Sequence, residues 1–357
     1  GFSSSGDCND CPFVNWDTTI QFKDDFSWTR GRHSLKLGTD IRRTRYNQIG
    51  AVVPRGRFTW DGRYTQNPTV ANAAATTGYS LGDMLLGHMS NTEGQVGAPI
   101  ANFRTHYLAF YLQDTWKVTS KLTVNWGLRW EDEPPYYDKH DAIVNIDFRW
   151  DHSMEPTFVR LGSGDPLAGN PQFPPGPDIK YVRDGRFGRR AGVNDANDFG
   201  PRVGIAYSLT PKTVIRTGAG IYYVRDIGNA VFDVVRNIPF TIRRNEPANQ
   251  FRPNQSWERP FTQLGAPTFL LINQHGERTS YVNQWSFGVQ RQLTQDMSLE
   301  ATYLGSSGVK LRRLFEYNRA EPGVGDVTPR RPFPKFAVFQ VMNAPSHSNY
   351  HALQVRL

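Results

Sequence analysis

The sequence has 357 residues, a net charge of +8 at pH 7 and 13% aromatic residues, although only 38% of its residues are hydrophobic. No run approaches the roughly 18 consecutive apolar residues of a transmembrane helix, so a helical membrane protein is excluded. The positive charge is compatible with a nucleic acid, an anionic lipid or an anionic ligand as partner. Because the sequence contains no basic helix and no known nucleic-acid module, we expect no nucleic-acid partner.

The first feature along the chain is a pair of cysteines, Cys8 and Cys11, the only two in the sequence. Their spacing is compatible with a redox pair, half of a zinc site or a small disulfide loop. No second cysteine pair, no histidine at zinc-finger spacing and no strand–helix unit accompanies them. We therefore favour a local disulfide, which fits an oxidising compartment. The N-terminal residues form no signal peptide, so we expect that one has been removed or that the chain begins within a longer protein.

Apolar and polar residues alternate with a period of two along most of the remaining sequence. In Leu122–Glu131, the clearest example, Trp126 and Trp130 fall on one face, whereas Asn125 and Arg129 fall on the other. Such segments of about ten residues, separated by turn residues, are typical of the strands of transmembrane β-barrels. The pattern recurs over residues 20–28, 35–41, 202–209, 213–223, 284–292, 298–303 and 353–357, the last of these as the start of a further strand.

The predicted connections between these strands alternate between short and long. The short ones are Gly31-Arg32, Val118–Lys121, Thr210–Lys212 and Thr294–Asp296, and the long ones are about Gly62–Phe103, Glu133–Asn197, Arg225–Thr279 and Gly305–Asn349. Transmembrane barrels have short periplasmic turns and long extracellular loops, whereas loops this long are rare in compact soluble domains. We therefore predict an all-β fold, an antiparallel transmembrane β-barrel represented here by roughly 11–12 strands, with long extracellular loops.

Two short helices are predicted within the long connections. Residues Gly78–Gly87 contain Ser80 as a candidate N-cap, a short apolar run and a terminal glycine. A second helix is expected around Asn229–Val235. Aromatic residues near the predicted strand ends suit the interfacial girdles of a membrane barrel: Trp28, Trp60, Trp116, Trp130, Tyr136, Tyr137, Tyr222, Tyr223 and Trp285.

The sequence contains no arrangement of residues that is typical of an enzyme. A cluster at the start of one long connection could hold calcium, but it lacks the spacing of a known calcium loop, so we interpret it as a solvated charged segment. Its members are Glu131, Asp132, Glu133, Asp138, His140 and Asp141. The segment Gly305–Gly308 lacks the G-x-S-x-G frame of a nucleophile elbow. We expect no enzymatic activity, no metal site and no cofactor.

Several strand motifs resemble those of TonB-dependent outer-membrane receptors. The hairpin FSWTRGRHSLKLG at residues 26–38 is similar to one common in that family, as is YLQDTWKVT at residues 111–119 leading into Leu122–Glu131. Phe199–Tyr207, followed by Lys212–Tyr223, resembles the Oar-like branch, and so does Tyr303–Gly308. The ending, Ser348–Val355, resembles a later strand of the same barrels. The resemblance covers essentially the whole chain and implies a bacterial outer-membrane location.

By this resemblance, residues 1–357 are expected to be part of a single outer-membrane β-barrel domain. Family members carry a TonB box and a plug domain that fills a barrel of roughly 22 strands, and neither segment is recognisable in this sequence. We expect the N-terminal plug and the C-terminal strands to be absent, and the chain to be a middle portion of a longer receptor. The TonB complex would then act through a plug that this chain does not contain.

The resemblance implies uptake of a scarce nutrient, such as an iron chelate, a cofactor or a glycan fragment. Outer-membrane lipid, lipopolysaccharide and a surface lipoprotein are the further partners that it suggests. Two alternatives stay open: a passive porin or adhesive surface barrel, and a secreted soluble β protein that binds carbohydrate. The alternation pattern gives the candidate lumen-facing residues, which are Arg129, Arg202, Arg216, Gln284, Gln290 and Glu300.

Overall fold

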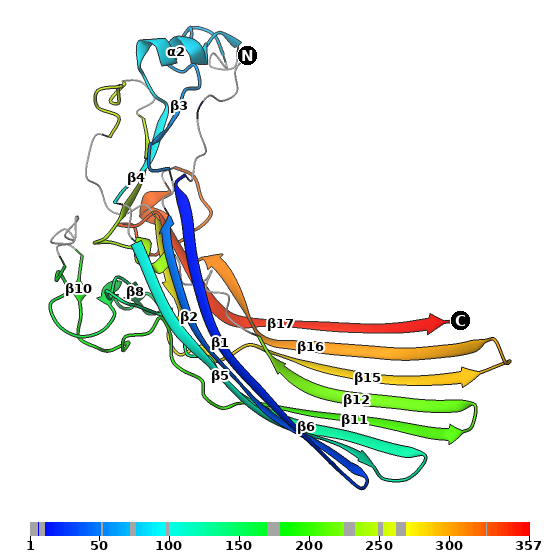
Figure 1. The fold of residues 1–357 in the computed structure, drawn as a ribbon. Coiled ribbons are helices and arrows are strands. Elements are labelled where there is room, and N and C mark those ends of the chain that lie inside the picture. The colour runs from blue at the N-terminus through cyan, green and yellow to red at the C-terminus, as the bar shows by residue number, and fades with distance from the viewer. Residues whose placement is uncertain are drawn as a thin grey trace.

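The computed structural model describes residues 6, 11–50, 53–71, 76–97, 100–169, 179–224, 233–248, 253–261, 269–325 and 327–357. Its main element is a mostly antiparallel eleven-stranded sheet that forms a curved wall (Figure 1). The long strands of this wall are β1 (Phe13–Arg30), β2 (His33–Gly50), β5 (Ile100–Lys117), β6 (Leu122–Asp132), β11 (Asp198–Thr210), β12 (Thr213–Tyr223), β15 (Tyr281–Gln292), β16 (Ser298–Glu316) and β17 (Val338–Arg356). The structure confirms the predicted all-β antiparallel fold, although the sheet does not close on itself.

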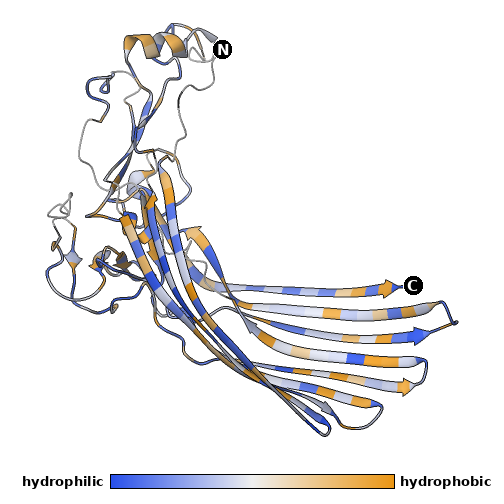
Figure 2. Ribbon diagram, viewed as in Figure 1, coloured by the Kyte–Doolittle hydropathy of each residue, from blue (hydrophilic) through white to orange (hydrophobic). Residues whose placement is uncertain are grey.

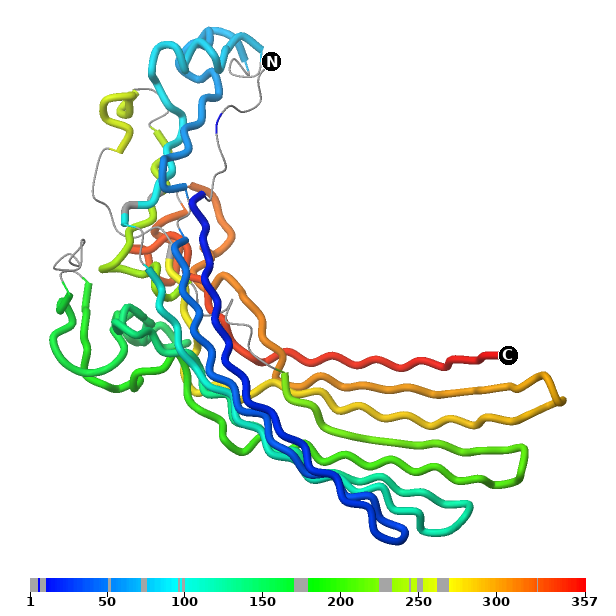
Figure 3. Tube along the Cα trace, viewed as in Figure 1, coloured from blue at the N-terminus to red at the C-terminus, as the bar shows by residue number. Residues whose placement is uncertain are grey.

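The long strands follow one another around the wall in their order along the chain. The turn between β1 and β2 is tight, because Arg30 pairs with His33 and Gly31 takes the left-handed conformation, with a φ of +59°. The other short turns also lie at this end of the strands, and the long connections gather at the opposite end (Figure 3). We call these the turn end and the loop end of the wall.

The predicted alternation is present along the wall strands (Figure 2). Leu37, Leu112 and Leu128 lie in register across β2, β5 and β6, and Leu128 is 44% exposed. We call the side that carries these leucines the apolar face, and the opposite side the polar face. An exposed apolar face costs free energy in water but not against lipid, so this arrangement is typical of a membrane barrel.

The two last strands of the wall differ from the prediction. Gly305 lies within β16 and Asn349 within β17, so the predicted connection Gly305–Asn349 is wrong at both ends. The final residues, which were expected to begin a strand, complete β17. The pairing register of β16 and β17 shifts between Gly308 and Leu311. Such a bulge interrupts the period of two, which hides the strands from a search for alternation.

The long connections form a folded layer at the loop end rather than extended loops. They contain two three-stranded sheets with the orders β10-β9-β8 and β13-β4-β3, and β14, which runs parallel to β17 in the wall. The elements of this loop layer are β3 (Arg57–Thr59), α2 (Ser80–Leu86), β4 (Asn91–Val96), β7 (Tyr137–Asp138), β8 (Val144–Asp147), β9 (Thr157–Arg160), β10 (Tyr181–Val182), η1 (Asp233–Arg236), β13 (Ile242–Pro247), β14 (Phe269–Asn273) and η2 (Thr328–Arg330).

The first predicted helix is confirmed as α2. Its N-cap is Tyr79, which makes no side-chain capping bond, so the prediction of Ser80 as the cap is wrong by one residue. Gly87 ends the helix as predicted, with a φ of +77° that favours glycine. The second predicted helix overlaps only the short 3₁₀ helix η1, and residues 225–232 before it lie outside the described part of the chain.

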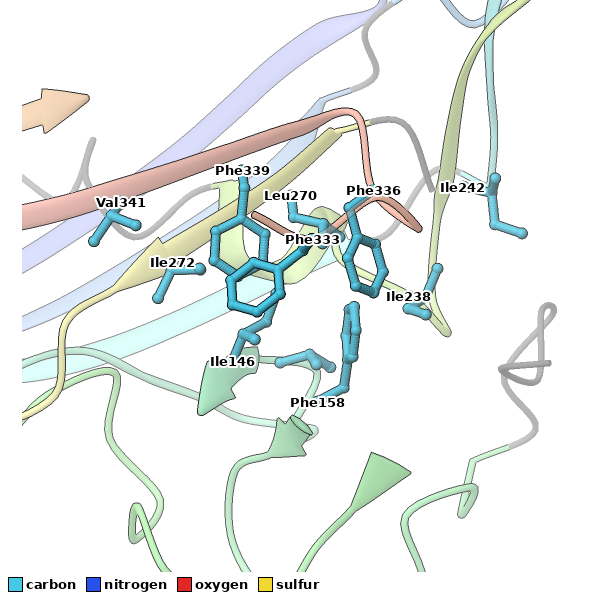
Figure 4. Packing of buried hydrophobic residues seen from close by; sticks show 11 residues of the cluster. Ile146, Phe158, Ile238, Ile242, Leu270, Ile272, Phe333, Phe336, Phe339 and Val341 are labelled. Carbon is cyan, nitrogen blue, oxygen red and sulfur yellow. The ribbon is translucent and has the colours of Figure 1, made fainter. Parts of the chain in front are cut away.

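A hydrophobic core holds the loop layer together (Figure 4). The ring of Phe336 packs against the rings of Phe158, from β9, and Phe339, with centroids 5.8 and 6.2 Å apart. The side chain of Asn318 is buried below them and donates to the carbonyl oxygens of Phe333 and Phe336 at 3.0 and 2.7 Å. Because buried backbone groups need partners, this asparagine fixes the segment that leads into β17.

The predicted aromatic girdle is wrong for at least three of its members. Tyr136 is only 7% exposed and belongs to a buried hydrophobic cluster. Trp60 belongs to the loop layer, where its ring lies 5.3 Å from that of Trp257. Tyr222 lies on the polar face, with its ring 4.4 Å from the guanidinium of Arg202. Trp28 and Trp116 do lie close to the turn end of the apolar face.

Candidate ligand-binding wall and cavity

The strand register places all the candidate wall residues on the polar face. Arg202 of β11 lies opposite Gly220 of β12, which lies opposite Gln284 of β15. Nearer the turn end, Gln290 lies opposite Glu300 of β16. These side chains therefore form a polar surface that extends over several neighbouring strands.

Small residues give the arginines of the polar face room to lie along the wall. A Cβ atom on Gly220 would meet the Cγ atom of Arg202 at 3.0 Å and the ring of Tyr222 at 3.2 Å. With glycine there, the guanidinium of Arg202 stacks on Tyr222. This arrangement leaves the guanidinium at the surface of a shallow hollow of about 580 Å³, which Gln284 also lines.

Arg216 and Gln290 form a second polar pair closer to the turn end. The guanidinium of Arg216 donates to the side-chain carbonyl of Gln290 at 2.7 Å. The carboxylate of Glu300 accepts a hydrogen bond from the hydroxyl of Thr302 at 3.2 Å. A neutral amide leaves the charge of Arg216 uncompensated, so this arginine can still attract an anion.

Arg129 belongs to a closed network instead. Its Nε atom donates to Glu131 at 2.6 Å, and its Nη2 atom donates to the hydroxyl of Tyr107 at 2.8 Å. That hydroxyl in turn donates to Glu131 at 2.5 Å. The side chains of Arg129 and Glu131 are each 19% exposed. Since its donors are engaged within the wall, Arg129 is better suited to hold the wall rigid than to bind a ligand.

The network continues onto β2. The guanidinium of Arg42 lies over the ring of Tyr107 at 5.1 Å and donates twice to Asp40, at 2.9 and 2.5 Å. Gln21 of β1 donates to the same carboxylate at 2.9 Å. The polar face of these strands therefore has fixed side chains and nearly balanced charge.

A cavity of about 520 Å³ lies where the polar face meets the loop layer. This volume lies within the range of about 300–1,000 Å³ that is usual for small-molecule sites. Arg42, Tyr107 and Glu131 of the network form one wall of the cavity. The remaining charged lining comes from loop segments and strand ends: Glu133, Asp195, Asp198, Glu277, Arg278, Arg312 and Arg313.

The cavity contains carboxylates and guanidiniums in similar numbers, so it suits a polar ligand with groups of both kinds. The guanidinium of Arg278 lies 3.6 Å from the carboxylate of Asp195. None of the candidate residues predicted from alternation lines this cavity. Sequence reasoning missed it because its residues come from separate long connections that carry no periodic signal.

The acidic cluster at the start of the second long connection is divided by the fold. Asp138 accepts hydrogen bonds from the backbone amides of Asn102 and Ala142, at 2.6 and 3.1 Å. Asp141 forms ion pairs with Arg183 and Arg189, at 2.6 and 2.5 Å. No group of three or more histidine, cysteine, aspartate or glutamate side chains among the described residues is placed to hold a metal ion.

Cys11 is disulfide-bonded. Cys8 lies outside the described residues, so the pairing of these two cysteines stays a prediction. Across the part of the chain that the structure describes, no helix has the length and apolar character needed to cross a membrane.

Comparison with solved structures gives matches to outer-membrane transporters and receptors at low sequence identity. The outer membrane transporter YddB from Escherichia coli matches with a TM-score of 0.48 and 10% identity over 96% of this chain and 30% of that chain. The copper transporter OprC matches with a TM-score of 0.42 and 12% identity over 95% of this chain and 34% of that chain. The ferric enterobactin receptor PfeA, from Pseudomonas aeruginosa, matches with a TM-score of 0.43 and 10% identity over 96% of this chain and 33% of that chain. The chain thus spans about a third of the length of these proteins, and no curated protein matches it.

A family model described as an outer membrane beta barrel domain matches residues 1–357. The match covers the wall strands together with the loop layer. A barrel domain of this kind is also what the apolar face indicates, together with the short turns at one end of the wall and the long connections at the other. This chain therefore belongs to the family of outer membrane beta-barrel domains, and its location is the bacterial outer membrane.

Proposed function

We propose that this chain forms part of the wall and of the extracellular layer of a TonB-dependent receptor that takes up a scarce nutrient. The observation that carries the proposal is the polar face of the wall, which leads into the mixed-charge cavity below the loop layer. This arrangement suits a ligand that is first bound in the preformed cavity and then moves along the polar face. The candidate ligands are those that the family resemblance implies: an iron chelate, a cofactor or a glycan fragment.

In this proposal the polar face lines the lumen of the closed barrel. Arg202, Arg216, Gln284, Gln290 and Glu300 offer hydrogen-bonding groups along the route, and Arg129 stiffens the wall through Glu131. The loop layer covers the extracellular entrance, and its packed core keeps the cavity residues in place. We assign no chemical reaction to the chain.

The open sheet supports the proposal of a larger barrel. Among the residues that the structure describes, β1 forms one edge, and most of β17 has no strand beside it at the other edge. Unpaired backbone groups are too costly in the lipid core, so we propose that further strands close the sheet. By family resemblance, a plug domain would then fill the lumen and transmit the pull of the TonB complex. A surface lipoprotein resting on the loop layer remains a further candidate partner.

A passive porin or an adhesive surface barrel is the alternative that shares the same wall. A porin would admit solutes without a TonB complex, and an adhesin would bind without uptake. A secreted soluble protein does not agree with the outer-membrane location. The loop layer favours a receptor over a porin, because it occupies the end of the wall at which solutes would enter.

The test measures uptake by cells that carry the complete receptor, with and without the TonB complex. The probes are a ⁵⁵Fe-loaded catecholate siderophore, a ⁵⁵Fe-loaded hydroxamate siderophore, cyanocobalamin and a fluorescein-labelled oligosaccharide. We expect saturable uptake of one probe class that is lost without TonB. Uptake that rises linearly with concentration and does not depend on TonB would support the porin instead. Surface binding without uptake of any probe would support the adhesin.

A further inference from the structure

The cavity below the loop layer has a buried acidic side. Asp198, the first residue of β11, lies directly opposite Glu131 of β6 in the sheet, and both side chains line the cavity. Asp195 lines it too, and Asp198 is only 5% exposed. Like charges that lie directly opposite each other destabilise an antiparallel sheet. Two such carboxylates at the wall of a cavity therefore indicate a place for a positively charged group.

The described part of the chain supplies no cation to Asp198. Glu131 and Asp195 each lie beside a guanidinium group. Among the described residues, by contrast, no lysine, arginine or histidine forms an ion pair with Asp198. The charged groups that act on it most strongly are Asp195, Glu131 and Asp132, which are all carboxylates. Because a buried charge is costly without a partner of opposite sign, Asp198 is placed to take up a cation.

A basic group of residues lines the same cavity. It consists of Arg278 and of Arg312 and Arg313, which belong to β16, and all three residues are exposed. Arg313 donates to the side-chain oxygen of Asn343 at 3.3 Å, and this neutral partner leaves its charge uncompensated. Guanidinium groups bind carboxylates with paired hydrogen bonds. The cavity therefore combines buried acceptors for a cation with exposed donors for an anion.

We propose that the cavity binds a small zwitterion, with its ammonium group at Asp198 and Glu131 and its carboxylate at Arg313. The inference rests on the proposed function, because it names the chemical class of the ligand that the cavity holds. An ammonium group offers three hydrogen-bond donors, and ionised carboxylates are acceptors only. A metal ion fits less well, because no three acidic, histidine or cysteine side chains among the described residues are placed to hold one. Free amino acids and short peptides are the simplest ligands of this class.

The experiment measures binding of alanine, dialanine and trialanine to the complete receptor in a neutral detergent, by saturation-transfer difference NMR. These zwitterions differ in the distance between their charged ends, so the test does not depend on one ligand length. We expect at least one of them to bind at millimolar concentration. The N-acetyl derivative of the tightest ligand should bind at least ten-fold more weakly, because it has no ammonium group. The C-terminal amide, which has no carboxylate, should bind at least three-fold more weakly.

Two substitutions should remove the two preferences separately. Asp198→Asn keeps the shape of the side chain but removes its charge, so it should weaken binding of the zwitterion at least ten-fold and bind the N-acetyl derivative equally well. Arg313→Gln should bind the zwitterion and its amide equally and still prefer the free ammonium group. A purely structural defect would instead weaken binding of every ligand alike. The matched control, Asp296→Asn, removes an exposed carboxylate near the turn end and should bind within two-fold of the wild type.

Three results would overturn the proposal. The first is that none of the three zwitterions binds to the wild type, and the second is that the N-acetyl derivative binds as tightly as the free ligand. The third is unchanged binding of the zwitterion to Asp198→Asn, which would show that this carboxyl group does not hold the ammonium group. If Asp198→Asn fails to fold, the N-acetyl and amide derivatives decide the matter on the wild type and on Arg313→Gln.

This result is separate from that of the uptake test, because binding is measured without the TonB complex. If no zwitterion binds but another probe is taken up in a TonB-dependent manner, the inference fails and the proposed function stands. If zwitterions bind but no uptake depends on TonB, the inference stands and the proposed function fails.

Discussion

The indole of Trp285 lies over Gly305 on the neighbouring strand, so closely that a Cβ atom added at Gly305 would collide with it. The ring of His351 lies 5.9 Å from the same indole, on the next strand along. Glycine at this position therefore allows a large aromatic side chain to lie flat against the apolar face.

We expect Gly305→Ala to destabilise the barrel, because Trp285 would have to leave its position. Overpacking of this kind costs about 1–3 kcal/mol. The matched control is Gly204→Ala, since the atoms nearest to an added Cβ there lie at 3.8 Å, an ordinary contact. Urea unfolding of the reconstituted receptor, followed by tryptophan fluorescence, measures the difference. Equal free energies of unfolding for the two variants would contradict the packing that we describe.

Glu131→Gln should destabilise the wall, because Arg129 would lose its carboxylate partner in a site where both side chains are only 19% exposed. We expect a loss of about 1–2 kcal/mol, less than for a fully buried pair. Arg216→Gln serves as the comparison, because the hydrogen bond of Arg216 to Gln290 joins it to a neutral amide at an exposed position. It should change the free energy of unfolding by less than about 0.5 kcal/mol. A larger loss in the free energy of unfolding for Arg216→Gln than for Glu131→Gln would show that the network around Arg129 does not hold the wall.

Asn318→Ala should loosen the loop layer without opening the wall. The substitution leaves the amide of Phe333 without a partner in a buried site, and it removes one hydrogen bond from each of the carbonyls of Phe333 and Phe336. Unsatisfied buried groups cost about 1–3 kcal/mol each. Limited proteolysis of whole cells should therefore cut the layer faster in this variant than in the wild type. Asn349→Ala, at an exposed position in β17, is the control and should leave the cleavage rate unchanged.

The loop layer should also loosen in mild acid. Burial lowers the pKa of His275 below its ordinary value of 6.5, and a neighbouring carboxylate, Asp147, opposes this only in part. The imidazole stacks on Phe187 with ring centroids 4.6 Å apart. Because the folded state binds the proton less readily than the unfolded state does, stability falls as the pH drops below about 6.5 and levels off below the folded pKa.

Hydrogen exchange of the segment around His275, measured from pH 7.5 to pH 5, tests this expectation. The wild type should lose protection as the pH falls, and His275→Gln should show a weaker pH dependence. His347→Gln, which changes an exposed histidine, should behave like the wild type. The same pH dependence in His275→Gln and the wild type would exclude His275 as the cause.

The wall could be predicted from the sequence because lipid on one side and polar groups on the other impose a period of two on every strand. Residues Leu122–Glu131 were predicted as a strand, and β6 runs from Leu122 to Asp132. The same signal fails in β17, where only the last residues alternate clearly. There the pairing shifts near Leu311 on β16, and the strand continues into the loop layer, where both of its faces are covered.

The loop layer and the cavity could not be predicted in this way. β8, β9 and β10 have two to four residues each and are stable only because segments distant in the sequence pack around Phe158. The cavity likewise combines Glu133, Asp195, Glu277 and Arg312 from separate connections. The candidate wall residues came from alternation alone, and alternation does not distinguish Arg129, whose charge is neutralised by Glu131, from Arg216.

The central claim is that the two faces of this sheet meet lipid and water, respectively. Nitroxide labels at Leu128→Cys and Arg129→Cys, each introduced with Cys8 and Cys11 replaced by serine, test it in the complete receptor in lipid bilayers. Electron paramagnetic resonance then measures how often each label collides with oxygen, which is concentrated in lipid, and with a water-soluble nickel chelate. We predict that the label at residue 128 collides mainly with oxygen and that the label at residue 129 is shielded from the lipid. Equal oxygen accessibility at both positions, or mainly nickel accessibility at residue 128, would contradict the claim that this sheet is the wall of an outer-membrane barrel.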